Sequence, residues 1–328
     1  MADPDGRIRL TVLGGYLGSG KTTWLRHQLH AGTFKDPFVI VNEAAETPVD
    51  DALLARASGI EVISGGCVCC VARDELVALL RRLCDERSRV SSTGRRLEQI
   101  VLETSGLADP GPIVAAILAD PMLVHHIYVA EIIVAVDALH ALDQLRTEPL
   151  GRSQIETADR LILTKVDVAE PEALRRLIAT LHVLNPGASI SGAVKGSDAP
   201  LPDVAGASPE PLPALGDAPD PAPIFPTKLV IDDSIDWAAF SVWLSALLHA
   251  RGHDIVRVKG VVRTPAGRLL LQTVRKVVQA PEILPEQDDD PRREDGTIVV
   301  IGRNYKPEDL RRSLHHFAGI GQRKGAGV

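Results

Sequence analysis

Short apolar runs alternate with longer stretches of helical spacing through the first ~195 residues of this 328-residue chain. The stretches at residues 21–29 and 75–84 have the spacing of helices. Strands alternating with helices are typical of a parallel sheet wrapped by helices. The runs that predict strands are rich in branched aliphatic residues and lie at 9–13, 38–41, 60–63, 100–102, 132–136 and 161–163.

Residues 197–226 break this alternation. Proline and alanine dominate the segment, and no hydrophobic period persists through it. Such a composition predicts a semi-extended linker between two domains.

A smaller unit occupies residues 227–328, and its pattern is that of an α+β domain. Two strands, at 254–262 and 269–278, are predicted to form a hairpin around residues 265–267. The other predicted elements are a strand at 228–231, an amphipathic helix at 237–248, a strand at 297–301 and a helix at 307–317.

Composition and charge exclude several classes of function. The net charge is −7 and no long basic run occurs, which argues against nucleic acid as a partner. No apolar run approaches the ~18 residues of a membrane span, and the polar start MADPDGRIRL does not resemble a signal peptide. Four cysteines in this length do not make a disulfide scaffold, so we expect a reducing, cytoplasmic setting.

Residues 15–22, GYLGSGKT, fit the phosphate-loop pattern G-x-x-x-x-G-K-[ST] between a predicted strand and a predicted helix. Glycines let backbone N–H groups curl around a phosphate at a helix N-terminus. Lys21 is expected to reach the β- and γ-phosphates, and the Thr22 hydroxyl to bind Mg²⁺. This predicts a P-loop NTPase domain at 1–196, whose nucleotide-binding residues are Gly15, Gly18, Ser19, Gly20, Lys21, Thr22 and Thr23.

The stretch Glu103-Thr104-Ser105-Gly106 comes directly after the apolar part of the predicted strand QIVLE. A carboxylate at that strand end can hold Mg²⁺ or its waters, and the Gly106 N–H can reach the γ-phosphate and move when that phosphate leaves. Lys21, Glu103 and Gly106 are therefore the candidate catalytic residues. The plainer alternative is that Glu103 only caps a turn.

Thr164-Lys165-Val166-Asp167 comes after another predicted strand, LIL. The Asp167 carboxylate can accept hydrogen bonds from guanine N1–H and its amino group, which adenine does not offer, and the Lys165 stem can lie over the base. Together with Thr164, these residues predict selection of GTP. The alternative is an ordinary surface turn.

Three of the four cysteines lie within GGCVCC, at Cys67, Cys69 and Cys70. Three thiolates suit a soft or borderline divalent ion and leave one tetrahedral corner open for transfer. The loop comes after the strand IEVI, so we expect it on the same edge of the sheet as the nucleotide, with Glu43 or Glu46 as a weaker fourth ligand. The alternatives are small buried side chains or a redox switch. Cys84, on the helix expected to begin near Asp74, is predicted to lie in the core, and His125-His126 at a solvated boundary.

The segments GGYLGSGKTT, VNEAAE, GGCVCC, ETSGLADP and LTKVD occur in this order. The chain thereby resembles the CobW-like GTPases, relatives of the accessory GTPases for urease, hydrogenase and methylmalonyl-CoA mutase. RVKG at 257–260 and VVIGRN at 299–304 resemble the smaller domain of that family. The resemblance implies a GTPase that carries or inserts a divalent metal, with zinc and cobalt the usual candidates.

The chain departs from the family pattern at several positions. NEAAE at 42–46 replaces the commoner NEFGE. No histidine occurs between His182 and His249, where many members are histidine-rich, and Arg275 stands where a histidine is often seen. The missing histidines argue against a role in metal storage, and Arg275 reduces the number of metal-binding side chains in the second domain. Loss of the Phe-Gly pair bears instead on the flexibility of the switch segment.

The expected function is therefore GTP hydrolysis coupled to delivery of Zn²⁺ or Co²⁺ to a client protein. GTP is expected to pull residues 42–50 and the Gly106 turn towards the γ-phosphate and to raise metal affinity, and hydrolysis to release the ion. The alternative is a metal-sensing module, regulated by nucleotide or redox state, with little hydrolysis. A small-molecule kinase is a third interpretation, and homodimerisation is left open.

Overall fold

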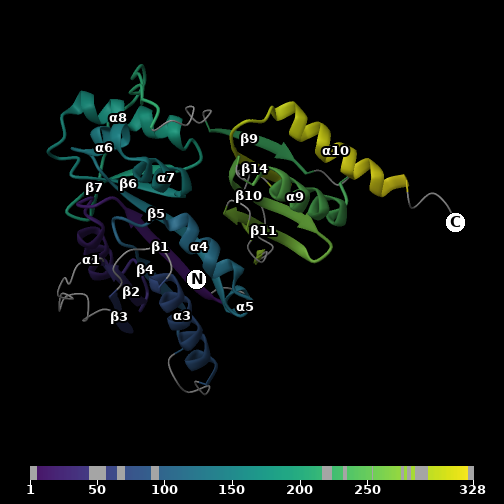
Figure 1. Cartoon of the computed structure of the whole chain (residues 1–328), viewed down its shortest axis with the longest axis horizontal. Coiled ribbons are helices and arrows are strands. Elements are labelled where there is room, and N and C mark those ends of the chain that lie inside the picture. Colours follow the sequence, from purple (N-terminus) through teal and green to yellow (C-terminus); the bar gives the residue numbers. More distant parts are fainter. Residues whose placement is uncertain are drawn as a thin grey trace. The chain divides into compact units, whose positions relative to one another are not determined.

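The computed structural model divides the chain into two compact units, Met1–Pro221 and Ala222–Val328, and each is described by itself (Figure 1). Cys67, Cys69, Cys70, Glu46 and Arg275 lie outside the described residues. The residues that the structure describes are 6–43, 57–64, 71–89, 96–215, 224–231, 235–252, 254–274, 277–278, 282–284 and 295–323.

The first unit is built on a mostly parallel sheet, which confirms the predicted fold class. Its strand order within the described residues is β3-β2-β4-β1-β5-β6-β7-β8, and each neighbouring pair is parallel except β7 with β8. The strands are β1 (Ile8–Gly15), β2 (Phe38–Glu43), β3 (Gly59–Ser64), β4 (Gln99–Glu103), β5 (Ile127–Asp137), β6 (Arg160–Thr164), β7 (Ser189–Val194) and β8 (Ser197–Ala199).

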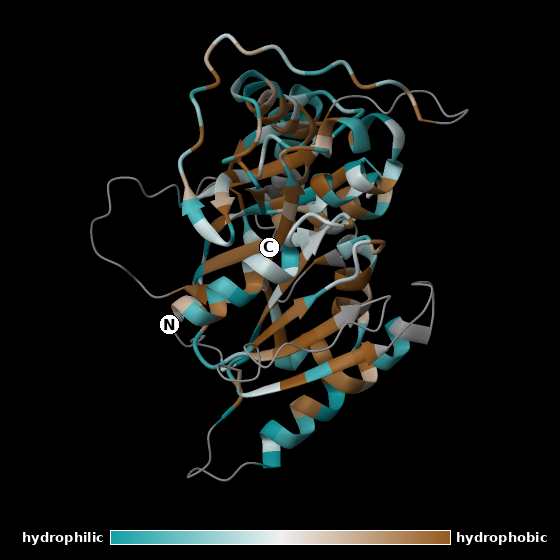
Figure 2. Ribbon diagram, turned by 90° about the vertical axis from the view of Figure 1, so that its left-hand side faces the viewer, coloured by the Kyte–Doolittle hydropathy of each residue, from teal (hydrophilic) through white to brown (hydrophobic). Residues whose placement is uncertain are grey.

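The central strands are buried on both faces, which explains why they read as continuous apolar runs. In β1, Leu10, Val12 and Leu13 are fully buried. In Figure 2, many of the strands are coloured brown, the colour of hydrophobic residues. The helices of this unit are α1 (Lys21–Ala31), α3 (Val71–Arg89), α4 (Pro110–Ala119), α5 (Leu123–His126), α6 (Ala141–Thr147), α7 (Pro149–Thr157) and α8 (Pro171–Leu184).

Helix α1 is fixed to the sheet by its apolar side. Trp24, Leu25 and Leu29 pack in one cluster with residues of β1, β2, β4, β5 and β6. Burying each such side chain contributes about 1.5–3 kcal/mol, so the orientation of α1 is strongly determined. The N-terminus of α1 is thereby held at the end of β1, and the loop between them has a fixed frame.

The structure differs from the prediction in the segment expected to be a linker. Residues 197–199 form β8, paired with β7, and residues between 205 and 213 are bound to helices of the first unit. Arg175 donates to the Ala205 carbonyl at 2.9 Å, Arg152 donates to the Pro213 carbonyl at 2.7 Å, and the Glu210 carboxylate pairs with Arg146 and Arg176. Composition alone misses this, because a segment without its own apolar pattern can still be held by arginines of α6, α7 and α8. The division between the units falls after Pro221.

The second unit is a small α+β domain, as predicted. Its antiparallel sheet has the order β12-β11-β10-β14-β9, with β13 paired to β11. Phe240, Trp243 and Leu244 of α9 pack against the sheet. The elements are β9 (Phe225–Val230), α9 (Trp237–Arg251), β10 (Ile255–Thr264), β11 (Gly267–Val274), β12 (Val277–Val278), β13 (Glu282–Leu284), β14 (Thr297–Gly302) and α10 (Pro307–Arg323).

Among the described residues, no helix has both the length and the apolar character needed to cross a membrane.

Candidate functional site

The loop between β1 and α1 has the backbone of a phosphate cradle. Gly15, Gly18 and Gly20 have φ of 137°, 73° and 80°, a region that favours glycine. A Cβ on Gly15 would lie 2.4 Å from the Ala135 carbonyl oxygen and 2.7 Å from Ser19 Oγ. The first glycine of the motif is therefore required by both its dihedral angle and its surroundings.

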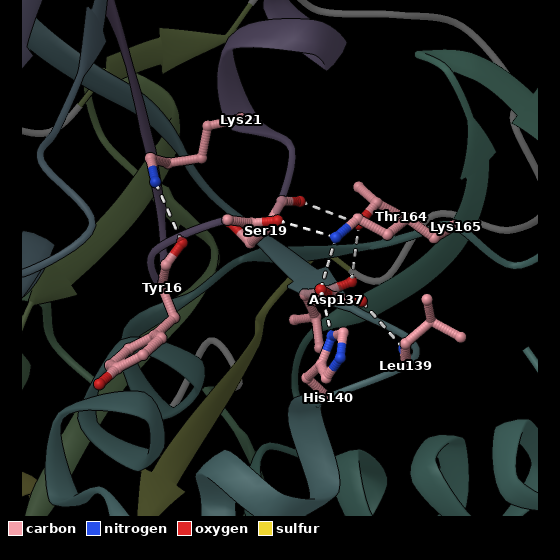
Figure 3. A network of polar contacts seen from close by, with 10 residues as sticks. Tyr16, Ser19, Lys21, Asp137, Leu139, His140, Thr164 and Lys165 are labelled. Carbon is pink, nitrogen blue, oxygen red and sulfur yellow. Dashed lines mark hydrogen bonds and ion pairs between the residues drawn. The ribbon is translucent and has the colours of Figure 1, made fainter.

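The polar groups of this loop converge on one another. Lys21 is buried, and its Nζ donates to the Gly15 carbonyl at 3.0 Å. The same Nζ donates to the Tyr16 carbonyl at 3.2 Å (Figure 3). The Ser19 hydroxyl is buried and has no hydrogen-bond partner within the part of the chain that the structure describes. A buried hydroxyl without a partner is costly and fits a site made to bind a polar ligand.

Thr22 and Glu103 meet beside this loop. Thr22 Oγ1, in the first turn of α1, donates to Glu103 Oε1 at 2.5 Å, and Glu103 at the end of β4 is fully buried. Strand register explains the meeting, because Glu103 pairs with Leu13, two residues before Gly15. A hydroxyl and a carboxylate oxygen placed together are ligands that suit Mg²⁺.

The Gly106 turn lies directly against the phosphate loop. A Cβ on Gly106 would come within 2.7 Å of the Leu17 nitrogen and 2.9 Å of Leu17 Cα. Near the same turn, Gln154 of α7 donates to the Ala108 carbonyl at 2.7 Å and lies 3.4 Å from the Gly106 carbonyl. Gln154 was not identified from the sequence, since nothing in a lone glutamine on a helix signals such a role.

The end of β6 is tied to the same loop. Thr164 Oγ1 donates to the Ser19 carbonyl at 2.9 Å, and Lys165 Nζ donates to the Gly18 carbonyl at 3.0 Å. Lys165 has φ of 60°, rare for a residue with a side chain. Asp167 is exposed, so its carboxylate is accessible to a ligand. The structure therefore brings the TKVD segment and the phosphate loop together.

Asp137, at the end of β5, was not predicted and is central to this arrangement. Its Oδ2 lies 2.6 Å from Lys165 Nζ and 3.0 Å from His140 Nδ1, and its Oδ1 accepts from the Leu139 N–H at 2.9 Å (Figure 3). Burial acts to raise the pKa of Asp137, but the hydrogen bonds from Lys165, His140 and Leu139 outweigh it and the pKa is lowered. The available signal was the aspartate that ends the apolar run IIVAVD.

The turn after β7 was also missed. Gly196 has φ of 94°, and a Cβ there would lie 2.3 Å from His27 Cβ and 3.1 Å from the Thr23 carbonyl. Gln28 of α1 donates to the Gly196 carbonyl at 2.8 Å. Because β7 neighbours β6, this turn borders the Thr164 end of the site.

The cysteine loop itself lies outside the described residues, but both of its flanks are described. The strand register aligns four residues across the sheet, because Leu13 pairs with Glu103, Glu103 with Val41, and Val41 with Val62. β3 therefore ends on the same edge as β1. Since neighbouring strands are about 4.8 Å apart, the three spacings from β1 to β3 amount to about 14 Å.

The remaining metal candidates differ in how much of each is described. The backbone of Glu43 ends β2, opposite Ser64 of β3, and its side chain is outside the described part, as is Glu46. Helix α3 begins at Val71, earlier than the predicted start near Asp74.

Cys84 is buried in the core as predicted, and burial raises the pKa of its thiol to about 11. No cluster of three His, Cys, Asp or Glu suited to a metal occurs among the described side chains.

Comparison with known proteins gives the family. The model for the CobW/HypB/UreG nucleotide-binding domain matches residues 9–191, and that for the cobalamin synthesis protein cobW C-terminal domain matches residues 227–318. The zinc chaperone YjiA of Escherichia coli is 31% identical over 324 residues, which cover 95% of this chain and 98% of YjiA. The zinc chaperone CobW of Pseudomonas aeruginosa is 31% identical over 312 residues, covering 82% of this chain and 81% of that protein.

The solved structures agree with the sequence comparisons. The Zn(II)-bound YjiA GTPase from E. coli superposes with a TM-score of 0.59 at 25% identity, over 95% of this chain and 99% of that one. A Zn(II)-bound triple mutant of YjiA gives a TM-score of 0.60 at 26% identity, over the same shares of the two chains. With both of its units matched by the family's models and its full-length relatives at this identity, the chain belongs to the CobW/HypB/UreG family of P-loop GTPases.

Proposed function

We propose that this protein is a GTP-hydrolysing metallochaperone that binds a divalent metal at Cys67, Cys69 and Cys70 and delivers it to a client protein. The observation that carries the proposal is the strand register, which aligns Leu13 with Glu103, Val41 and Val62 across the sheet. Because of this register, the strand before the cysteines ends on the edge of the sheet that carries the phosphate loop. The names of the relatives, zinc chaperones in E. coli and P. aeruginosa, favour zinc over cobalt.

The phosphates of GTP fit the cradle formed by Gly15, Gly18, Ser19 and Gly20. Backbone N–H groups at the start of α1, the Lys21 ammonium and the buried Ser19 hydroxyl supply donors for them. The Thr23 backbone, one residue further into α1 than Thr22, belongs to the same helix terminus.

Thr22 and Glu103 would hold Mg²⁺, since their oxygens lie 2.5 Å apart beside the cradle. When bound there, the ion would neutralise negative charge on the β- and γ-phosphates. Lys21 adds a second positive charge at the same phosphates, and the Gly106 N–H would contact the γ-phosphate.

The base is assigned to the end of β6. The exposed Asp167 carboxylate would accept the two N–H donors of guanine, and the stem of Lys165 would lie along the ring. Thr164 anchors this segment through the Ser19 carbonyl. Guanine specificity therefore depends on the same loop that binds the phosphates.

Coupling to the metal derives from the shared edge. GTP would draw residues 42–50 and the Gly106 turn towards the γ-phosphate, bringing Glu43 or Glu46 towards the thiolates. Hydrolysis would release this segment and lower the affinity for the ion, which then passes to the client. Such coupling is reciprocal, so the metal must tighten GTP binding by the factor that GTP tightens metal binding.

Turnover measurements test the enzymatic part of the proposal. Phosphate release is measured from GTP and from ATP, with and without Zn²⁺. The proposal predicts hydrolysis of GTP over ATP that depends on Lys21 and responds to zinc. Zinc binding without measurable GTP turnover would favour the alternative, a metal-sensing module. The sequence feature that supports this alternative is the Ala44-Ala45 pair in NEAAE.

A further inference from the structure

Asp137 has no role in the proposed binding of GTP and metal, although it lies among the residues of the site. It lies at the end of β5, between the phosphate loop after β1 and the TKVD segment after β6, and it is 3% exposed. Three donors reach its carboxylate, from Lys165 Nζ, His140 Nδ1 and the Leu139 N–H (Figure 3). A buried carboxylate that accepts several hydrogen bonds is part of the folded structure and not a chance surface contact.

The Lys165 ammonium is the link between three strand ends. It donates to the Gly18 carbonyl at 3.0 Å and to Asp137 at 2.6 Å, while its backbone holds a φ of 60°. A left-handed conformation at a residue with a side chain persists only where surrounding contacts require it. Here the contact that pulls the side chain inwards is the ion pair with Asp137.

The chemistry of the contact requires a carboxylate. The Lys165 side chain is 38% exposed, so without a negative partner its ammonium can regain full hydration by turning outwards. Charge-assisted hydrogen bonds are roughly twice as strong as neutral ones. An amide at position 137 would keep the shape but not the attraction that holds the ammonium over the loop.

We infer that Asp137 is a positioning residue for guanine recognition. It holds the Lys165 ammonium against the Gly18 carbonyl and so fixes the turn that carries Asp167 relative to the phosphate loop. The inference rests on the proposed assignment of Asp167 to guanine. It adds a determinant of nucleotide specificity that lies on a different strand from the TKVD segment.

The first test is calorimetric titration of the full chain and of Asp137→Asn with GDP and with ADP. We expect the GDP dissociation constant to rise at least about 10-fold, with ADP binding nearly unchanged, so that the preference for GDP falls. If Asp137 had a purely structural role, the substitution would weaken the binding of GDP and of ADP by the same factor. The matched control is Asp143→Asn, an exposed aspartate of α6 paired with Arg146, for which no change is expected.

The second test asks whether Asp137 acts through Lys165. In a double-mutant cycle, Asp137→Asn added to Lys165→Met should cost no further GDP affinity, because the interaction is already gone. This comparison uses only Lys165→Met and the double variant, so it remains valid if Asp137→Asn alone does not fold. In steady-state GTP turnover, Asp137→Asn should have a raised KM and a kcat within about twofold of the wild-type value.

The outcomes separate the inference from the function on which it rests. A wild-type chain that binds GDP and ADP equally overturns the proposed guanine site, and the inference with it. A selective wild-type chain whose selectivity survives Asp137→Asn overturns the inference alone. Additive losses in the cycle do the same.

Discussion

The Thr22 hydroxyl donates to the Glu103 carboxylate at 2.5 Å, although the two residues are 81 positions apart in the chain. The contact joins the first turn of α1 to the end of β4. It is the point at which the phosphate loop meets the turn expected to sense the γ-phosphate.

Replacing Glu103 by glutamine tests this contact. The amide keeps the size of the side chain but removes the charge that a bound Mg²⁺ needs, so kcat for GTP should fall by about 100-fold or more. Turnover is measured across a series of Mg²⁺ concentrations. Glu98→Gln, a glutamate just before the same strand, is the control and should be indistinguishable from wild type. Equal turnover by wild type and E103Q at every Mg²⁺ concentration would remove Glu103 from the site.

Gly106→Ala should separate GTP from GDP binding. The new Cβ would meet the Leu17 backbone at 2.7–2.9 Å, so the turn must withdraw from the phosphate loop. Overpacking of this kind costs about 1–3 kcal/mol, and contact with the γ-phosphate should be lost. We expect the affinity for a non-hydrolysable GTP analogue to drop more than the affinity for GDP.

The control for that variant is Gly151→Ala in α7, where a Cβ would have only an ordinary 3.8 Å contact with Leu145. Equal losses for the two nucleotides in G106A would mean that the Gly106 turn does not distinguish them.

How far the sequence predicted the molecule depends on which signals are local. The strands β1, β2, β4 and β6 were predicted because burial on both faces makes each a continuous apolar run. The phosphate loop was predicted because glycine spacing is local. β7, with the sequence SISGAV, carries two serines and a glycine and gave no such signal.

Contacts between distant segments were not predictable in the same way. The partners Asp137 and Lys165 are 28 positions apart and meet only through the register of β5 with β6. Gln154 reaches the Ala108 carbonyl across 46 positions. The attachment of residues 205–213 to α7 and α8 depends on arginine contacts that composition does not reveal.

Acid should weaken the fold through Asp137. Burial acts to raise its pKa, but hydrogen bonds from Lys165 and His140 dominate and lower it. A carboxyl whose folded pKa is depressed contributes stability above its unfolded pKa of about 3.9, and that contribution is lost as pH falls through the folded value. Urea unfolding from about pH 6 to pH 3 should therefore show a steeper loss of stability for wild type than for Asp137→Asn. Parallel curves for the two proteins would contradict this.

Alkali should weaken the second unit through Tyr305. Burial raises the pKa of its hydroxyl to about 12, and the hydroxyl donates to the Val300 carbonyl at 3.1 Å. The folded state thus favours the protonated form, so the stabilisation is complete below the unfolded pKa of about 10 and is lost as pH rises through the folded value. Denaturant unfolding between about pH 9 and pH 12 should depend less on pH in Tyr305→Phe. A pH dependence unchanged by the substitution would exclude Tyr305 as its source.

The proposed metallochaperone cycle is tested most directly by a competitive Zn²⁺ titration of the full chain in three states: bound to a non-hydrolysable GTP analogue, bound to GDP, and free of nucleotide. The same titrations are repeated with Cys67, Cys69 and Cys70 changed to serine. The account predicts that the GTP-analogue state binds zinc at least about 10-fold more tightly than the GDP state, a coupling of about 1.4 kcal/mol, and that the serine variant loses this difference. Equal zinc affinity in the GTP-analogue and GDP states, or a difference that survives the loss of all three thiols, would contradict it.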